Sequence, residues 1–344
     1  MKQKIKNYFE NLNPKRLGLE NKIRITSISQ LGMGTSNLNY LVKANGKSFV
    51  FRLNMKIKLR NKSKQEFEAL KIVEKHKIGP KAWILDDTRR EFDNDFIIID
   101  YIEGKIIDET REYLKTEMFS HLGELCGKLH SIKIVGNLKK LKKEATIQGY
   151  KGYSRLIIKE EYLDYINSNV KSKQLLGIIN ETYKKLNENL PNNKYKPEIV
   201  LTQGDFCEQN VIVHNKEYKL IDFEDLRLTD RAGHLAHIFI DFGRPFENYQ
   251  MELFFEEYLK KVRINKEILM EKINIWVPIK LFAIFLWSIN HILRIKNREM
   301  HSKFVEQSNM ERNFSYVRIM LKRNIRFGLI DSKYSNFDIV KALK

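Results

Sequence analysis

The sequence is poor in cysteine and has no long uninterrupted apolar run. Its two cysteines, Cys126 and Cys207, are too few for a disulfide framework and are not spaced as metal ligands. The N-terminal stretch MKQKIKNYFENLNPKR lacks the apolar segment of a secretory signal, so we expect a cytoplasmic protein. The most apolar window, residues 273–293, is broken by proline, lysine, asparagine and histidine. This pattern favours a buried helix over a membrane span.

Positive charge is in excess, with a formal net charge of +19. Such a surplus fits either a nucleic-acid surface or a lysine-rich overall composition. The lysines are spread over the whole chain and no RNA- or DNA-binding motif accompanies them, so we expect no dedicated nucleic-acid site. With 344 residues, of which 42% are hydrophobic and 31% charged, the chain is long enough for two lobes with a sizeable core.

The segment Leu201–Asp225 concentrates the residues that carry chemistry. Two short apolar runs, Val211–Val213 and Lys219–Ile221, flank a polar turn and predict an antiparallel hairpin. Because a hairpin returns the chain to its starting point, we expect Asn210, just before the first strand, to lie beside Asp222, just after the second.

These side chains are suited to a divalent cation. Asn210, Asp222 and Glu224 offer the hard oxygen ligands that Mg²⁺ prefers when it carries a nucleotide phosphate. Asp205, on the loop before the hairpin, is left to orient an attacking hydroxyl. The segment therefore outlines a phosphotransferase.

A glycine-containing turn lies between two predicted strands, Ile23–Leu31 and Asn39–Ala44. Glycine allows backbone N–H groups to approach an anion closely, and side chains of the turn add donors. The candidate phosphate-binding residues here are Gly32, Gly34, Thr35, Ser36 and Asn37. The alternative is a simple glycine-rich hairpin turn, and the cation on the next strand favours the phosphate interpretation.

That cation is Arg52, which lies within the apolar strand Ser48–Leu53. A charge in such a strand needs a partner. The helix predicted over Lys64–Glu74 carries Glu66 near its start. The alternative is that Arg52 only protects an edge strand from aggregation.

The motif Gln203-Gly204-Asp205, Asn210 and Asp222-Phe223-Glu224 resembles the catalytic and metal-binding segment of the aminoglycoside phosphotransferase and choline kinase families. The usual family pattern is H-G-D-x-x-x-x-N followed, after a hairpin, by D-x-D or D-x-E. The resemblance implies an α+β, bilobal protein-kinase-like fold. Residues 1–102 would form a small N-terminal lobe with an antiparallel sheet, and residues 103–344 a larger, mainly helical C-terminal lobe.

The resemblance also implies roles and cofactors, namely ATP and Mg²⁺. Arg52 would contact the nucleotide phosphates and pair with Glu66, whose distance from Gly79-Pro80 resembles choline kinase spacing. The linker between the lobes would bind the adenine ring through backbone groups. Its candidate residues are Asp100, Tyr101 and Ile102. Asp205 would be the catalytic residue, and a small-molecule hydroxyl the acceptor.

Two positions depart from the family pattern, Gln203 in place of His and His234 in place of Asp. They keep open a catalytically silent nucleotide-binding protein of the same fold. A protein kinase is disfavoured, because Glu224 stands where those enzymes have Gly and no A-P-E segment follows. The acceptor stays open between an aminoglycoside, choline or ethanolamine, and a sugar or other metabolite; Arg52, Ile78-Gly79-Pro80 and the tryptophan-rich C-terminal helix tilt toward choline or ethanolamine.

Overall fold

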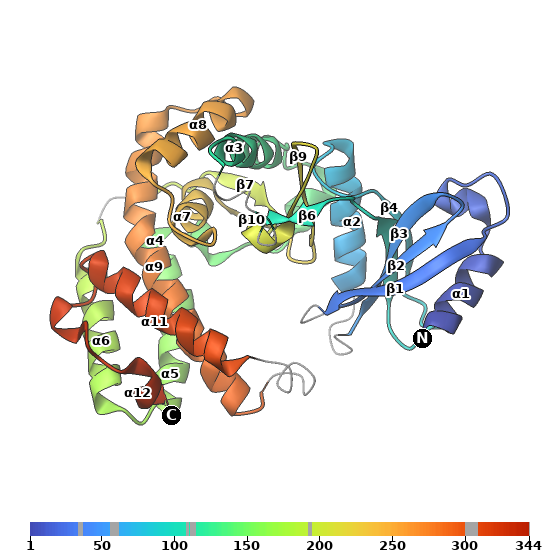
Figure 1. The fold of residues 1–344 in the computed structure, drawn as a ribbon. Helices are drawn as coiled ribbons and strands as arrows, with labels where there is room; N and C mark the ends of the chain where they lie inside the picture. The colour runs from blue at the N-terminus through green and yellow to red at the C-terminus, as the bar shows by residue number, and fades with distance from the viewer. Residues whose placement is uncertain are drawn as a thin grey trace. The chain divides into compact units, whose positions relative to one another are not determined.

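The N-terminal part of the chain forms a five-stranded antiparallel sheet (Figure 1). The computed structural model describes residues 1–33, 37–55, 62–107, 110, 115–191, 195–299 and 309–343. The strands lie in the order β1-β2-β3-β5-β4, with bounds Ile25–Met33, Asn37–Ala44, Lys47–Asn54, Phe96–Asp100 and Ala82–Asp86. Asn45 and Gly46 both have positive φ and form the β2–β3 turn, as the Asn-Gly pair predicts.

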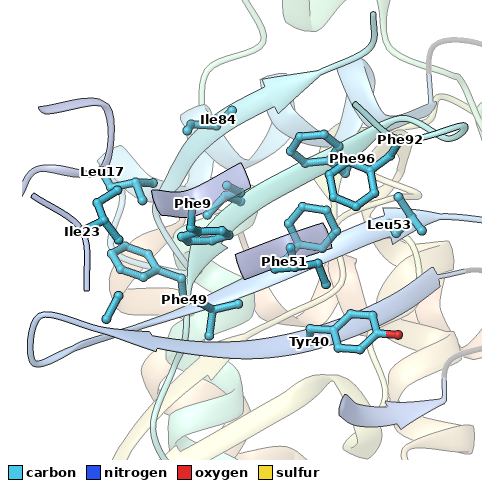
Figure 2. Packing of buried hydrophobic residues seen from close by; sticks show 14 of the residues in the cluster. Phe9, Leu17, Ile23, Tyr40, Phe49, Phe51, Leu53, Ile84, Phe92 and Phe96 are labelled. Carbon is cyan, nitrogen blue, oxygen red and sulfur yellow. The ribbon is translucent and has the colours of Figure 1, made fainter. Parts of the chain in front are cut away.

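The N-terminal helix α1 (Lys2–Asn11) covers one face of this sheet. Its Phe9 is fully buried, with ring centroids 6.3 Å from Phe49 and 6.5 Å from Phe51 (Figure 2). Because side chains alternate along a strand, the Arg52 side chain leaves β3 on the opposite face. The sequence predicts a short helix or arm here, and the structure has a helix that completes the core.

Two longer helices of the N-terminal part of the chain are α2 (Lys62–Lys75), before strand β4, and α3 (Glu117–His130), after strand β6 (Lys105–Ile106). α2 follows β3, and α3 packs against α8 (Asn248–Lys261). The contact is close at Gly123, where an added Cβ would overlap the carbonyl oxygen of Phe254. Glycine therefore allows these two helix backbones to approach.

The predicted hairpin of the catalytic segment is present. β8 (Val211–His214) pairs with β9 (Glu217–Leu220), and β6 (Lys105–Ile106) pairs with β8. Asn215 and Lys216 have positive φ and form its turn. A second small sheet pairs β7 (Ile199–Thr202) with β10 (Arg227–Asp230).

The C-terminal part is mainly helical. One continuous helical run consists of α4 (Gly149–Tyr153), the π-helix Ser154–Leu163 and α5 (Asp164–Asn169). The longer helices and the last one are α6 (Lys173–Glu188), α7 (Arg231–Asp241), α9 (Lys266–Lys296), α11 (Met310–Arg326) and α12 (Ile339–Leu343). Short 3-10 helices follow α1 at Pro14–Leu17 and precede β8 at Glu208–Asn210.

α9 contains the apolar window noted in the sequence. It is long and apolar enough to cross a membrane by length and composition, but 72% of its most apolar 18-residue stretch is buried inside the protein. Trp276, Phe282 and Phe285 are all fully buried. These features are those of a core helix, which is what the interrupted sequence predicts.

The chain divides into two compact units. One comprises Met1–Lys133, Leu201–Arg227 and Asn248–Val262, and the other Ile134–Val200, Leu228–Glu247 and Arg263–Lys344. The first unit contains the sheet and the whole catalytic segment through Arg227. The division into lobes at residues 102 and 103 stays a prediction.

Candidate phosphotransfer site

The β8–β9 hairpin brings Asn210 and the residue before Asp222 into direct backbone contact. Val211 pairs with Leu220, and the backbone N–H of Ile221 donates to the carbonyl oxygen of Asn210 over 2.9 Å. Asp222 itself has a φ of 60°, a left-handed conformation that is uncommon for a residue with a side chain. The hairpin thus fixes Asn210 and Asp222 as neighbours, as its sequence predicts.

Asp205 is held from the other side of the same loop. The Asn210 side-chain amide Nδ2 donates to the Asp205 carbonyl oxygen over 2.8 Å and to its carboxylate Oδ2 over 2.9 Å. Both protons of the amide are thereby used on Asp205. The amide oxygen Oδ1 of Asn210 is left as an acceptor or metal ligand.

Gln203, the residue that replaces the usual His, is fully buried and joins the two halves of the segment. Its Nε2 donates to the carbonyl oxygens of Ile221 (2.8 Å) and Asp222 (2.6 Å). Its Oε1 accepts from the backbone N–H of Asp205 (2.9 Å). Gln203 therefore positions both acidic residues through their backbones.

Gly204 allows this loop to turn. Its φ is 98°, and an added Cβ would overlap the carbonyl oxygen of Asp225. The carbonyl oxygen of Gly204 accepts a 2.6 Å hydrogen bond from Nη2 of Arg227. Arg227 is a positioning residue that the sequence analysis missed, and no spacing rule in the motif identifies it.

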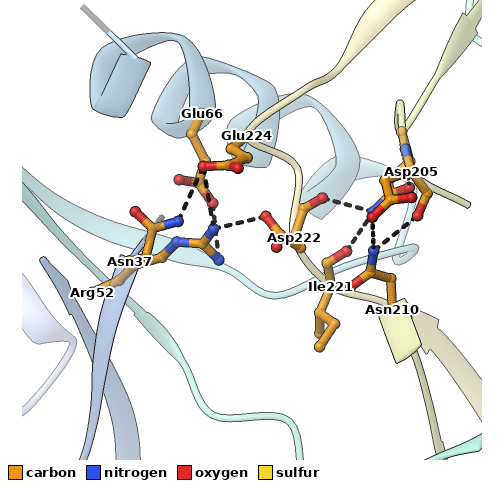
Figure 3. A network of polar contacts seen from close by, with 9 residues as sticks. Asn37, Arg52, Glu66, Asp205, Asn210, Ile221, Asp222 and Glu224 are labelled. Carbon is orange, nitrogen blue, oxygen red and sulfur yellow. Dashed lines mark hydrogen bonds and ion pairs between the residues drawn. The ribbon is translucent and has the colours of Figure 1, made fainter. Parts of the chain in front are cut away.

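Arg52 is the centre of the charged network shown in Figure 3. It is 7% exposed, and its Nη2 donates to Oδ1 of Asp222 over 2.7 Å. Its Nη1 lies 3.3 Å from Oε1 of Glu66, and its Nη2 lies 3.9 Å from Oε2 of Glu224. The structure thus brings the predicted pair Arg52 and Glu66 together and joins both to the hairpin acids.

Burial has opposite effects on the two members of this pair. It raises the pKa of Glu66 to about 7, although the charge of Arg52 opposes the shift. Burial alone lowers the pKa of Arg52, but Glu66 and Asp222 outweigh it, so the pKa is raised and the guanidinium stays charged. Arg52 therefore supplies a permanent cation.

Asn37 links the predicted phosphate-binding turn to the acids. Its Nδ2 donates to Oε2 of Glu224 over 3.0 Å, and the residue is 7% exposed. Gly32 lies in β1. Gly34, Thr35 and Ser36 lie outside the described residues.

Asp205 is an exposed residue of the site. The protein around it nevertheless raises its pKa, and the negative charge of Asp222 adds to the shift. The hydrogen bond from Asn210 acts in the opposite direction. A carboxylate with a raised pKa is a better proton acceptor than an ordinary aspartate.

The predicted linker residues fall into two groups. Tyr101 and Ile102 line a pocket of about 400 Å³, together with Ile212 of the hairpin. Asp100 also borders it, but its carboxylate accepts a 2.5 Å hydrogen bond from Nε1 of Trp83. One oxygen of the Asp100 carboxylate is thereby engaged, and the backbone contact predicted for the linker stays a prediction.

The donor set fits Mg²⁺. Oδ1 of Asn210 is directed away from Asp205, and the side chain of Asp222 is 37% exposed although one oxygen holds Arg52. The second carboxylate oxygen of Asp222 is a hard ligand of the type that Mg²⁺ prefers. Glu224 offers a further carboxylate, and its side chain is 17% exposed. Asn210 and Asp222 are therefore suited to a shared metal ion. Glu224 faces Arg52 and Asn37, and its place among the ligands stays a prediction.

Several solved structures have the same fold. A choline kinase from Cryptosporidium parvum Iowa II matches with a TM-score of 0.64 and 16% identity, over 98% of this chain and 100% of that one. A spectinomycin phosphotransferase in complex with ADP and spectinomycin matches with a TM-score of 0.58 and 16% identity, over 86% and 89%. An amicoumacin kinase in complex with AMP-PNP and Ca²⁺ matches with a TM-score of 0.60 and 12% identity, over 96% and 97%. Curated protein sequences give no significant match.

These structures confirm the predicted kinase-like α+β fold, with an antiparallel sheet in the N-terminal part and a mainly helical C-terminal part. A family model described as the phosphotransferase enzyme family matches residues 27–267, which include the sheet, Arg52 and the entire catalytic segment. The predicted family resemblance and the predicted class, a small-molecule kinase, are confirmed. The chain belongs to the phosphotransferase enzyme family.

Proposed function

We propose that the protein transfers the γ-phosphoryl group of ATP, in complex with Mg²⁺, to a hydroxyl group of a small molecule. The observation that carries this proposal is the continuous network from Arg52 on β3 to Asp222 and Glu224 after β9 (Figure 3). The network contains a cation for the phosphates and acids for a metal. Asp205 lies beside it and is held by Asn210.

Asn210 and Asp222 would hold Mg²⁺, with Glu224 supporting the cluster. The ion, when bound, neutralises phosphate charge and orients the nucleotide. The protein contributes the geometry: Gln203 fixes the backbone of Asp222, and the ladder bond of Ile221 fixes Asn210. The ADP, AMP-PNP and Ca²⁺ in the complexes of similar structures support a nucleotide and a divalent cation here.

Arg52 would grip the non-transferred phosphates, with Glu66 holding the other side of its guanidinium. The turn Gly32–Asn37 would cover the phosphates. Asn37 is tied to Glu224, which supports the placement of this turn close to the metal ligands. The backbone of Asp100–Ile102 would meet the adenine ring, with Ile212 as an apolar surface.

Asp205 would accept a hydrogen bond from the acceptor hydroxyl and align it for in-line attack on the γ-phosphorus. The Asn210 amide fixes the orientation of its carboxylate. As the P–O bond to the acceptor forms and the bond to the β-phosphate oxygen breaks, the hydroxyl proton passes toward Asp205. The raised pKa of Asp205 suits this role.

The acceptor belongs to one of three classes: an aminoglycoside, choline or ethanolamine, or a sugar-like metabolite. The similar structures include a choline kinase and a spectinomycin phosphotransferase, which support the first two classes. We favour choline or ethanolamine. We further propose that the protein acts in the cytoplasm and that residues 1–102 and 103–344 serve as nucleotide-binding and acceptor-binding lobes.

The second candidate is a catalytically silent nucleotide-binding protein, which Gln203 and His234 keep open. The contacts of Gln203 count against it, because all its polar atoms serve to position Asp205 and Asp222.

A coupled assay of ADP release tests the proposal. The purified protein would be given Mg–ATP and a panel of alcohols, amino alcohols and aminoglycosides, with Asp205→Ala as the blank. Turnover of one acceptor that depends on Asp205 and on Mg²⁺ is the expected result. Binding of Mg–ATP without turnover of any acceptor in the panel would favour the silent protein.

A further inference from the structure

Two buried polar atoms of the candidate site have no hydrogen-bond partner. Among the described residues, the side-chain oxygen Oδ1 of Asn39 and the Nε of Arg52 are both in this state. The two residues stand directly opposite each other in the β2–β3 ladder. Cross-strand neighbours in such a pair share one face of the sheet and have Cβ atoms about 5 Å apart.

The two atoms are complementary, since one is an acceptor and the other a donor. The remaining nitrogens of Arg52 are engaged: Nη1 with Glu66 at 3.3 Å and Nη2 with Asp222 at 2.7 Å. The guanidinium is thus drawn to the acids of α2 and the hairpin. A buried polar group without a partner weakens a fold, and such groups in native structures call for a functional explanation.

The ion pair with Asp222 is the contact that the proposed function would alter. Asp222 is a proposed metal ligand, and a cation bound to its second oxygen draws negative charge away from the oxygen that holds Arg52. The contact between Arg52 and Asp222 is then weaker, and the guanidinium can turn toward another acceptor. Asn39 lies opposite Arg52 on the same face of the sheet, and its Oδ1 is available as an acceptor.

We propose that Asn39 is a positioning residue for nucleotide binding: its Oδ1 accepts a hydrogen bond from Nε of Arg52 when the metal–nucleotide complex is bound. This fixes the guanidinium through Nε and Glu66, and leaves Nη2 to the phosphates. The inference rests on the proposed function. The competing explanation is a purely structural one, in which a buried water joins the two atoms at all times.

The test compares Asn39→Leu with the matched control Asn7→Leu on the exposed side of α1. Leucine has a similar size and removes the unpaired acceptor. We expect the melting temperature of the unliganded Asn39→Leu protein, without Mg²⁺, to be unchanged or higher. The Kd for the ATP analogue AMP-PNP with Mg²⁺, measured by calorimetry, should rise about tenfold, as expected for a lost hydrogen bond to a charged group. With EDTA in place of Mg²⁺, Asn39→Leu and Asn7→Leu should bind the analogue with equal Kd.

A double-mutant cycle with Arg52→Lys sharpens the test, because lysine has no Nε. In that background Asn39→Leu should have no further effect on the Kd. A Kd for Mg–AMP-PNP within twofold of the wild type overturns the inference. A lower melting temperature with equal loss of affinity in Mg²⁺ and in EDTA also overturns it and favours the structural water.

Two further variants separate a failure of the inference from a failure to fold and from a failure of the proposed function. If Asn39→Leu does not fold, Asn39→Val, which suits a strand, takes its place in the same measurements. Asp222→Asn reports on the proposed function separately: if this variant keeps the wild-type dependence of affinity on Mg²⁺, the proposed metal site is wrong. If Asp222→Asn loses that dependence and Asn39→Leu does not weaken binding, only the inference about Asn39 fails.

Discussion

Nη2 of Arg52 lies 2.7 Å from Oδ1 of Asp222, although 170 positions separate the two residues in the sequence. The contact joins the third strand of the N-terminal sheet to the residue that follows the catalytic hairpin. It places a permanent cation among three carboxylates, those of Glu66, Asp222 and Glu224. This relationship makes the charge balance of the site depend on one side chain.

Replacing Arg52 with methionine should destabilise the protein strongly. The change leaves Glu66 buried without its cation, and losing one partner of a buried ion pair costs about 3–5 kcal/mol. Urea unfolding of the unliganded protein measures the effect. Lys6→Met, which removes the exposed Lys6–Glu10 pair, is the control and should cost less than about 1 kcal/mol. Equal effects of the two changes would contradict the central role of Arg52.

Replacing Asp205 with asparagine should lower kcat by about 10²–10⁴-fold, the usual contribution of a positioned proton acceptor. The melting temperature should change little, because the amide keeps the shape and one oxygen of the carboxylate. Steady-state kinetics with the best acceptor of the panel, together with thermal unfolding, check both expectations. Glu188→Gln, at the exposed end of α6, is the control. A retained kcat would assign the catalytic role to another residue.

The pH profile of kcat/KM should reflect the raised pKa of Asp205. The residue must be ionised to accept a proton, so activity should be lost as the pH falls through its pKa. Because partial desolvation by the surrounding loop and the charge of Asp222 raise that pKa, the acid limb should lie above the ordinary aspartate value of about 3.9. The profile should be recorded in Mg²⁺ at constant ionic strength. An acid limb that stays at the same pH in Asp205→Glu would assign it to another group.

Glu66 predicts a pH dependence of stability in the unliganded protein. Its pKa is about 7 in the folded state against an ordinary value of 4.5, so the folded state binds this proton more tightly than the unfolded state does. The stability that Glu66 contributes is therefore fully present below pH 4.5 and is lost as the pH rises through about 7. Glutamine does not titrate. The melting temperature of the wild type relative to Glu66→Gln should thus fall between pH 5 and pH 8, and a constant difference would rule out the raised pKa.

Gly204→Ala should abolish turnover and destabilise the fold. The added Cβ would overlap the carbonyl oxygen of Asp225 and would demand a φ of 98° from alanine. Gly177→Ala in α6 is the matched control, because nothing lies within 4 Å of its added Cβ. That change should leave activity intact and stabilise the helix by about 0.5–1 kcal/mol. Thermal unfolding and the coupled assay report both effects.

Much of the site could be predicted from the sequence because its geometry is local. A hairpin with a short polar turn fixes which residues meet at its ends, so the neighbourhood of Asn210 and Asp222 follows from the pattern alone. The pairing of Arg52 with an acid follows from the cost of a lone charge within an apolar strand. The strands of the N-terminal sheet could also be predicted, from their pattern of apolar residues and from the Asn45-Gly46 turn.

The remaining features depend on contacts between distant segments. The sequence does not show that Gln203 spans two loops, because a buried amide has no periodic signal. The carboxylate of Asp100 accepts a hydrogen bond from Trp83. The sequence does not show this contact, because the linker is assigned from its position and not from side chains. Asn39 was overlooked although a period-two reading of β2 places it on the same face as Asn37. The roles of the site residues and the extent of the lobes stay predictions.

The position of α1 has a practical consequence for any shortened form of the protein. Phe9 shields the rings of Phe49 and Phe51, which project from the back of the strand that carries Arg52. Deleting the first helix would uncover a patch of aromatic side chains on an antiparallel sheet. Such a truncated protein should self-associate, and its loss of phosphoryl transfer would then reflect a damaged scaffold rather than a missing reactive group.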